Sequence, residues 1–150
     1  MYLTDVLNIS EFVKLLLDKN KDLLKVPDEY EWTAFHYVAY NNLHTIVDDL
    51  VGEDKFVAYL PDKKDKRTTL HVAACKGNIC VMKKLVEYFP DCWEIVDGKG
   101  QNILHIAVEQ DQKEVIRYIL SEGCKANNNL LIQSEGFKLI RIATLGENRR

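Results

Sequence analysis

The chain has 150 residues, of which 47% are apolar and 29% are charged, and these proportions are ordinary for a globular domain with a sizeable core. Its formal net charge of −3 argues against nucleic acid or an anionic membrane surface as the partner. The sequence has no apolar run of about 18 residues and no secretory signal, so we expect a cytoplasmic protein without direct membrane insertion in this chain.

The N-terminal stretch carries an apolar set at helical spacing between Leu7 and Leu17. When the register of the later repeats is carried back, Tyr2 falls at the position that a histidine occupies downstream. We therefore predict that residues 1–26 form a degenerate N-terminal repeat or cap.

One sequence pattern then occurs three times along the chain. It reads TAFHYVAYNN from Thr33, TTLHVAACKG from Thr68 and NILHIAVEQD from Asn102. Its histidines, His36, His71 and His105, are spaced by 35 and 34 residues. Self-similarity with a period of about 33 residues is typical of helical repeat arrays. We predict an all-α solenoid of helix-turn-helix units joined by hairpin-like loops, with repeats at about 27–61, 62–96 and 97–127.

In the first repeat, Pro27 and the following acidic pair indicate an exposed turn. Thr33 is expected to cap a helix near 34–41, and a second helix is expected near 45–52. The side chains expected to face inward are Ile46, Val47, Leu50 and Val51, and those expected to form an apolar flap over the helix ends are Phe56, Val57, Tyr59 and Leu60.

In the second repeat, Thr68 is expected to cap the first helix and Gly77 to end it with a positive φ. Pro90 should stop the second helix. The third repeat starts from a turn at Asp97–Gly100. The inner faces of the two second helices are predicted to consist of Val81, Met82, Leu85 and Val86, and of Val115, Ile116, Ile119 and Leu120.

The C-terminal stretch, residues 128–150, can be aligned with the start of one more repeat, with Arg141 in place of the histidine. No second helix follows this alignment. We predict a degenerate capping turn and a flexible tail.

The four cysteines are not arranged as a zinc or redox motif. Cys75, Cys80, Cys92 and Cys124 lack paired C-x-x-C spacing. We expect reduced structural or surface thiols, in keeping with a cytosolic compartment.

The three repeats resemble the ankyrin repeat, whose pattern is G-x-T-P-L-H-x-A-A-x-x-G followed by V-V-x-x-L-L-x-x-G-A-D-x-N. The family's proline is replaced by Ala34, Thr69 and Ile103, and its glycine is kept only at Gly77. Asn42 and Asp111 replace the other two glycines, and both residue types tolerate left-handed geometry. The resemblance implies a non-catalytic protein-binding scaffold, without cofactors or metals.

A narrower set of residues resembles the ankyrin half of plant membrane-anchored proteins of the accelerated-cell-death type. The stretches concerned are Val57–Leu60, Tyr88–Asp91, Asp91–Asp97 and Gly98–Val108. This resemblance implies a role in plant defence or stress signalling. It also implies a place at the cytosolic face of a membrane, if the chain is part of a longer protein that carries a membrane segment.

The histidines are the first candidates for chemistry. Repeat spacing should place them about 10 Å apart, which is too far to share a zinc ion. The ankyrin resemblance implies a structural role instead, in which each histidine bonds to backbone and to the capping threonine; the residues assigned to this motif are Thr33, His36, Thr68, His71, Gly77 and His105. One competing hypothesis is an enzyme or regulated ligand site that uses His71, Cys75 and Cys80. We expect no enzyme, because the sequence has no nucleophile elbow, Walker loop or H-E-x-x-H motif.

The candidate binding surface is the concave face that repeat arrays form from their hairpin tips and first helices. Its predicted partner-binding residues are Tyr30, Trp32, Tyr40, Asn41, Lys64, Arg67, Lys76, Lys99, Gln101 and Glu109. Tyr30, Trp32, Tyr40 and Arg67 belong to residue types enriched at binding hot spots. The alternative is that Trp32 packs on the neighbouring hairpin and that Lys63–Arg67 is only a solvated tip.

These observations predict a protein-protein interaction module whose partner is a protein of unknown identity, with a related ankyrin protein as one candidate. The alternative is a shortened soluble fragment that competes with, or self-associates with, full-length membrane-anchored relatives. A fragment without an independent role is a third hypothesis, since about three repeats are needed for stability.

Overall fold

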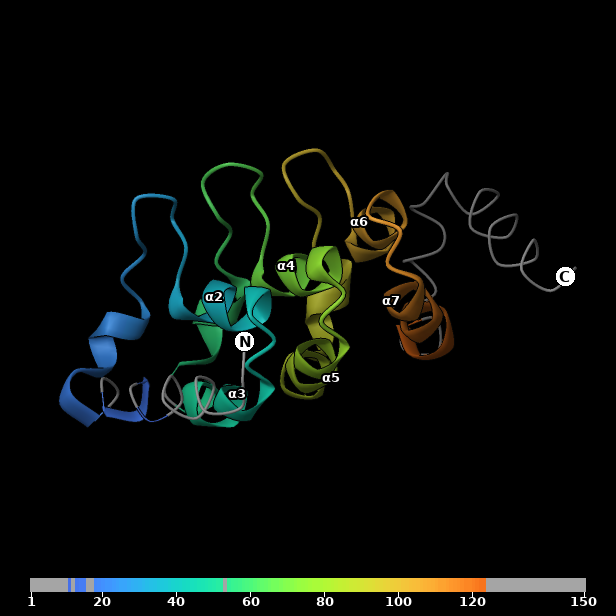
Figure 1. Cartoon of the computed structure of the whole chain (residues 1–150). Coiled ribbons are helices and arrows are strands. Elements are labelled where there is room, and N and C mark those ends of the chain that lie inside the picture. The colour runs from blue at the N-terminus through green and yellow to red at the C-terminus, as the bar shows by residue number, and fades with distance from the viewer. Residues whose placement is uncertain (1–10, 12, 16–17, 53, 124–150) are drawn as a thin grey trace, which may run out of the picture.

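The computed structural model describes residues 11, 13–15, 18–52 and 54–123. Within these ranges every regular element is a helix, which confirms the predicted all-α class. Three helix pairs follow one another along the array, and a long loop precedes each pair and projects from the same side (Figure 1). Half of the predicted N-terminal cap and all of the predicted C-terminal capping turn lie outside the described residues.

The described part of the chain has three helix pairs, and the bounds expected for the first pair match to within one residue. The pairs are α2 (Ala34–Tyr40) with α3 (His44–Val51), α4 (Thr69–Lys76) with α5 (Ile79–Tyr88), and α6 (Ile103–Glu109) with α7 (Lys113–Tyr118). Short helices connect or extend them: the 3₁₀ helices η1 (Lys21–Leu24), η2 (Lys55–Tyr59) and η3 (Pro90–Glu94), and the π-helical turn η4 (Ile119–Gly123).

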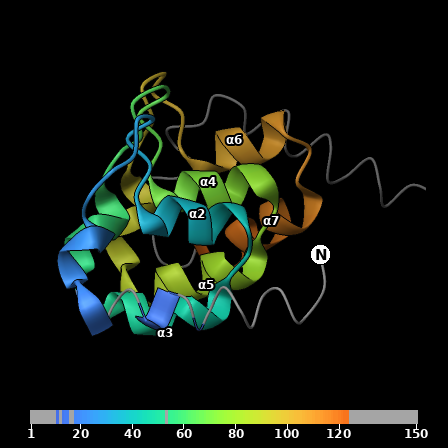
Figure 2. The same ribbon diagram turned by 60° about the vertical axis from the view of Figure 1, so that its left-hand side comes forward.

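The helices form two layers. The first helices α2, α4 and α6 pack side by side, and the second helices α3, α5 and α7 form the layer behind them (Figure 2). Ala39, Ala73, Ala74 and Ala107 on the first helices are fully buried. Their small side chains let the helix backbones approach closely, so the loops in front of them are also brought near one another.

The first two of these first helices start at the predicted caps, and α6 starts in the same way at Asn102. Thr33, Thr68 and Asn102 have extended backbone at the N-cap position, and the histidine three residues later completes a capping box. A capping box satisfies backbone N–H groups that have no partner inside the helix. The T-x-x-H spacing of the sequence therefore fixes where the helix starts.

The same helices end in left-handed backbone, as predicted. Gly77 has φ 76°, and Asn42 and Asp111, which replace the family glycine, have φ 56° and 52°. Asn and Asp accept this conformation better than most residues, so the chain can reverse into the second helix without glycine.

The core lies between the two layers and along the second helices. Of the inward-facing positions predicted for the three second helices, all are buried except Val86 and Leu120, which are half-buried. Phe35, with 0% of its surface exposed, and Trp93, with 1%, are the largest side chains at the centre of the core.

The prediction of an apolar flap within 55–62 is wrong for two of its residues. Val57 is buried, but Phe56 is 79% exposed and Leu60 is 40% exposed. The reason is local geometry, because η2 is a tight 3₁₀ helix in which neighbouring side chains diverge and only one side faces the core. Tyr59 does pack inward, with its ring centroid 5.4 Å from that of Phe89.

Thr69 offers a direct test of the family pattern, because it stands where ankyrin repeats have proline. It is the first residue of α4, it is fully buried, and its hydroxyl has no hydrogen-bond partner among the described residues. Thr68 before it is extended (φ −81°, ψ 172°), as proline requires of the preceding residue.

We expect Thr69→Pro to raise the free energy of unfolding by about 0.5–1 kcal/mol. Proline fits the first turn of a helix and reduces the entropy of the unfolded chain. Thr69→Val, which removes only the unpaired hydroxyl, serves as the control in urea denaturation followed by circular dichroism. A proline variant less stable than the valine variant would mean that the start of α4 cannot adopt the family geometry.

No helix in the described part of the chain is both long enough and apolar enough to cross a membrane.

Candidate functional site

The three projecting loops are organised by one aspartate each. Oδ1 of Asp28 accepts hydrogen bonds from the N–H groups of residues 30 and 32, both at 2.9 Å. Asp62 binds the N–H groups of residues 65 and 67 in the same way, and Asp97 binds those of residues 99 and 101. Each loop therefore has a fixed tip, and the side chains at the tip have defined positions.

Neighbouring loops are also bonded to each other. The N–H of Lys63 donates to the carbonyl oxygen of Tyr30 (3.1 Å), and the N–H of Gly98 donates to that of Asp65 (2.7 Å). These bonds join the three loops into one surface.

The second loop is one residue longer than the others. Its closing bond runs from Asp62 to Arg67, whereas the first loop closes from Asp28 to Trp32 and the third from Asp97 to residue 101. The extra residue accounts for the unequal histidine spacings of 35 and 34 residues.

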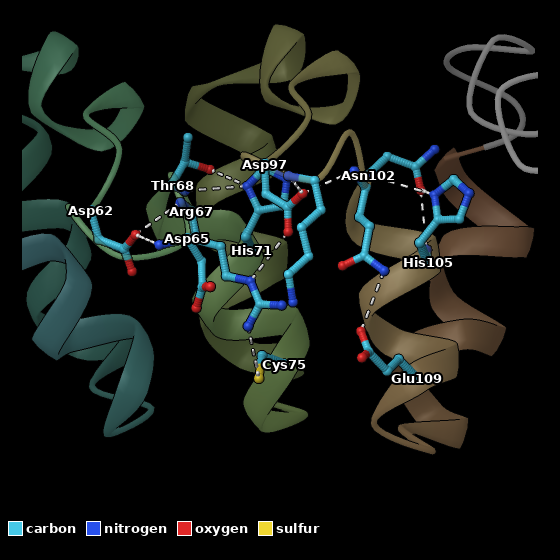
Figure 3. Close-up of polar contacts among 12 residues, drawn as sticks. Asp62, Asp65, Arg67, Thr68, His71, Cys75, Asp97, Asn102, His105 and Glu109 are labelled. Atoms are coloured by element: carbon cyan, nitrogen blue, oxygen red, sulfur yellow. Dashed lines mark hydrogen bonds and ion pairs between the residues drawn. The ribbon is translucent and has the colours of Figure 1, made fainter.

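The histidines connect the loops to the first helices. Nδ1 of His36 accepts from the N–H of Thr33 (3.1 Å), and its Nε2 donates to the carbonyl oxygen of Arg67 in the next loop (3.1 Å). His71 and His105 make the corresponding contacts to Thr68 and Asn102 through Nδ1 (Figure 3).

Two of these histidines are held in the neutral form. Burial lowers the pKa of His71 to about 4 and lowers that of His36 as well, although the nearby Asp97 and Asp62 carboxylates oppose the two shifts. In the described part of the chain, no three His, Cys, Asp or Glu side chains are grouped so that they could hold a metal ion.

Arg67 lies between the second loop and the third. Its Nε is 3.4 Å from Oδ2 of Asp97, whose side chain is fully buried, and its Nη1 is 4.0 Å from the sulfur of Cys75 (Figure 3). The guanidinium thus ties two loops together, and only 15% of the Arg67 side chain is exposed.

A groove of about 950 Å³ lies between the first two loops and the helices α2 and α4 behind them. Its lining residues come from the first and second repeats. They are Glu29, Tyr30, Trp32, Tyr37, Tyr40, Asn41, Asp62, Lys63, Lys64, Asp65, Arg67, Val72, Cys75 and Lys76.

Aromatic rings cover the first-repeat side of this groove. Trp32 stacks on His36 with ring centroids 5.8 Å apart, and its centroid lies 5.0 Å from that of Tyr37 and 5.5 Å from that of Tyr40. The Tyr37 hydroxyl donates to the carboxylate of Asp28, and this bond raises the pKa of Tyr37 to about 12. The cluster is therefore an ordered apolar surface with hydroxyl groups at its rim.

The floor of the groove is fixed by bonds between repeats. The Asn78 amide donates to the carbonyl oxygens of Ala39 (2.7 Å) and Tyr40 (3.0 Å). The Gln112 amide, one repeat later, donates to the carbonyl oxygen of Cys75 (2.9 Å). The last turns of α2 and α4, which carry Tyr40 and Lys76, are thereby held in place.

Seven of the ten predicted partner-binding residues lie together in the groove: Tyr30, Trp32, Tyr40, Asn41, Lys64, Arg67 and Lys76. Lys99, Gln101 and Glu109 belong to the third repeat and do not line it, and Gln101 instead donates to Glu109 (3.4 Å). Sequence reasoning missed Tyr37 as a lining residue and Asp28 as its partner. The role of Asp28 could have been predicted, because aspartate recurs at positions 28, 62 and 97 with the repeat period.

The residues named in the alternative hypotheses lie in different surroundings. The ring contacts of Trp32 are with His36, Tyr37 and Tyr40 of its own repeat. His71 is fully buried, Cys75 is half-buried at the groove and Cys80 is exposed. The three side chains differ in their access to solvent, and all three cysteines of the described residues are free thiols.

Stacked helix pairs with projecting loops and a lined concave groove define a helical repeat scaffold that binds proteins. The family model described as ankyrin repeats in three copies matches residues 54–129, slightly more than half of the chain. The chain belongs to the ankyrin repeat family, whose fold is a non-catalytic interaction scaffold.

Relatives with curated descriptions are long proteins. The chain is 29% identical over 117 residues to the yeast target of rapamycin complex 2 subunit AVO2, covering 74% of this chain and 26% of that protein. It is 26% identical over 125 residues to a putative palmitoyltransferase ZDHHC13 of Danio rerio, covering 79% of this chain and 19% of the relative. It is also 26% identical over 128 residues to the human transient receptor potential cation channel subfamily A member 1, covering 84% of this chain and 11% of that protein. The chain thus spans about a quarter or less of their length.

Among solved structures, a chain in the crystal structure of the yeast ribosomal protein Rps3 in complex with its chaperone Yar1 is similar in fold. The TM-score is 0.67 with 21% sequence identity, over 78% of this chain and 86% of that one.

Proposed function

We propose that the groove between the first two loops is the site at which this ankyrin scaffold binds its protein partner. The observation that carries the proposal is the gathering of four aromatic rings and three exposed lysines around one concavity of about 950 Å³. Aromatic residues are enriched at interfaces, and energetic hot spots cluster in well-packed central pockets. The groove is also preformed, so little ordering cost accompanies binding.

The cellular setting that we propose is plant defence or stress signalling, in the cytoplasm or at the cytosolic face of a membrane. It rests on the resemblance of the Tyr88–Asp97 region and its neighbours to the ankyrin half of plant membrane-anchored proteins.

The aromatic rings give the sharpest test of the groove. Tyr30 is 62% exposed and Tyr40 is 44% exposed, so both can be replaced without removing core packing. We expect the double variant Tyr30→Ala, Tyr40→Ala to lose affinity for the partner by about 30-fold or more, since a hot-spot truncation costs about 2 kcal/mol or more.

The matched control is Phe56→Ala, Val96→Ala, which also removes two exposed apolar side chains, 79% and 43% exposed, but outside the groove. Both variants and the intact chain would be compared in pull-downs from plant extract, after circular dichroism has established equal helix content. Partners lost by the groove variant and kept by the control support the proposal. Equal capture by all three proteins would overturn it, and recovery of the chain itself or a related ankyrin protein would favour self-association.

A further inference from the structure

The two sides of the groove differ in chemistry. The side formed by the first repeat carries Tyr30, Trp32, Tyr37 and Tyr40, whereas the side formed by the second repeat carries the exposed lysines Lys63, Lys64 and Lys76. An occupant therefore meets aromatic rings on one side and ammonium groups on the other.

Two of the acidic groups around the groove are already engaged inside the protein. The Asp28 carboxylate binds two backbone N–H groups and the Tyr37 hydroxyl, and Oδ1 of the buried Asp62 binds two backbone N–H groups. Glu29, which is exposed, and Asp65, which is half-buried, are the carboxylates of the lining that remain.

The lysines, in contrast, are available. Within the described ranges no carboxylate lies within 4.0 Å of the ammonium groups of Lys63 or Lys64, whereas Lys66 beside them pairs with Glu31 at 3.9 Å. Arg67 is occupied by Asp97 and contributes little free charge. The accessible charge of the groove is therefore positive, with the ammonium groups on its second-repeat side.

Lys76 links the two sides. Its ammonium lies over the Tyr40 ring, 4.3 Å from the centroid, and the Gln112 bond to the carbonyl oxygen of Cys75 holds the end of α4 that carries it. An ammonium placed on an exposed aromatic face gains only about 0.5–1 kcal/mol. It can therefore turn to a carboxylate of a partner at small cost.

We infer that the groove takes an acidic peptide segment of the partner protein, with an aromatic or large apolar side chain packed against the Trp32 cluster and carboxylates directed at Lys63, Lys64 and Lys76. This inference rests on the protein-binding role proposed above and names the chemistry of the partner. A basic segment would meet the same three ammonium groups, with the lining carboxylates of Glu29 and Asp65 as its acceptors.

The test is affinity selection of random peptides, displayed on phage, against the intact chain. We expect the enriched peptides to combine glutamate or aspartate with an aromatic residue. The enriched peptides are then synthesised, and their binding to the intact chain and its variants is measured by fluorescence anisotropy.

The charge variant is Lys63→Gln, Lys64→Gln, Lys76→Gln, and we expect it to weaken binding by about tenfold, because each exposed ion pair contributes roughly a factor of two to five. Binding to the intact chain should also weaken as sodium chloride is raised, because salt screens exposed charges. Lys55→Gln removes an exposed lysine from η2, outside the groove, and should leave the affinity unchanged.

Enriched peptides that are neutral or basic but still require Tyr30 and Tyr40 would overturn the acidic specificity, while the groove would remain the proposed binding site. Peptides that bind all variants equally, or no enrichment at all, would overturn both. A single-stranded oligonucleotide is tested in the same assay. If it binds the intact chain but not the variant without the three lysines, the occupant of the groove is nucleic acid and the acidic-peptide inference is overturned.

Discussion

Trp93→Ala is expected to lower the free energy of unfolding by about 3–5 kcal/mol. The indole lies in η3 with 1% of its surface exposed, and it packs against Tyr118 of the following repeat with ring centroids 6.0 Å apart. Its removal leaves a cavity between the second and third repeats. Because the free energy of unfolding of a small domain is about 5–15 kcal/mol, this one substitution should remove a large part of the stability.

The measurement is urea denaturation followed by circular dichroism. In a repeat array each unit contacts only its neighbours, so weakening one interface can separate the melting of the units. We therefore also expect a shallower transition for Trp93→Ala. Phe56→Ala, at a position that is 79% exposed, is the matched aromatic truncation and should change stability by no more than about 0.5 kcal/mol. A loss below about 1 kcal/mol for Trp93→Ala would mean that the indole does not join the two repeats.

Acidification from pH 7.5 to pH 4.5 is expected to lower the free energy of unfolding by about 2–3 kcal/mol through His71. Burial lowers the pKa of His71 to about 4 in the folded protein, whereas an exposed histidine has a pKa of 6.5. Between pH 6.5 and pH 4, the unfolded chain therefore binds a proton at His71 that the folded protein does not bind. Stability is complete above pH 6.5 and is lost as the pH falls towards 4. The lowered pKa of His36 acts in the same direction.

The check is the stability of His71→Gln across the same pH range. Its absolute stability is expected to be lower, but its dependence on pH between 6.5 and 4.5 should be flatter than that of the intact chain. His44→Gln replaces an exposed histidine and should keep the slope. Identical slopes for the intact chain and His71→Gln would contradict the assignment of this pH dependence to His71.

The architecture could be predicted because its determinants are local and repeated. Threonine or asparagine three residues before a histidine closes each capping box, and Gly77, Asn42 and Asp111 end the same helices at left-handed positions. Apolar residues at helical spacing then predict which side of each second helix is buried. These signals act within about a dozen residues of chain, so a single sequence contains them.

The site was predicted only in part, because its shape depends on contacts between repeats. Arg67 was expected as an exposed binding residue, but its guanidinium bonds to Asp97, which is 30 residues away in sequence. Tyr37 was not expected at the groove, and it lines the groove because its hydroxyl binds Asp28. Phe56 was expected to be covered, and the short turn of η2 directs it to solvent. None of these pairings follows from helical periodicity.

The extra residue of the second loop makes the repeats of this chain non-interchangeable. In the first loop, the carbonyl that accepts the bond from the next loop belongs to the second residue after the aspartate, Tyr30. In the second loop it belongs to the third residue after the aspartate, Asp65. A side chain at Gly98 would place its Cβ 3.0 Å from that carbonyl oxygen, whereas Lys63 occupies the corresponding position one repeat earlier. The third repeat is thus shaped to follow the second, so duplication or exchange of single units would bring mismatched loops together. The succession of repeats is specified by the lengths of their loops.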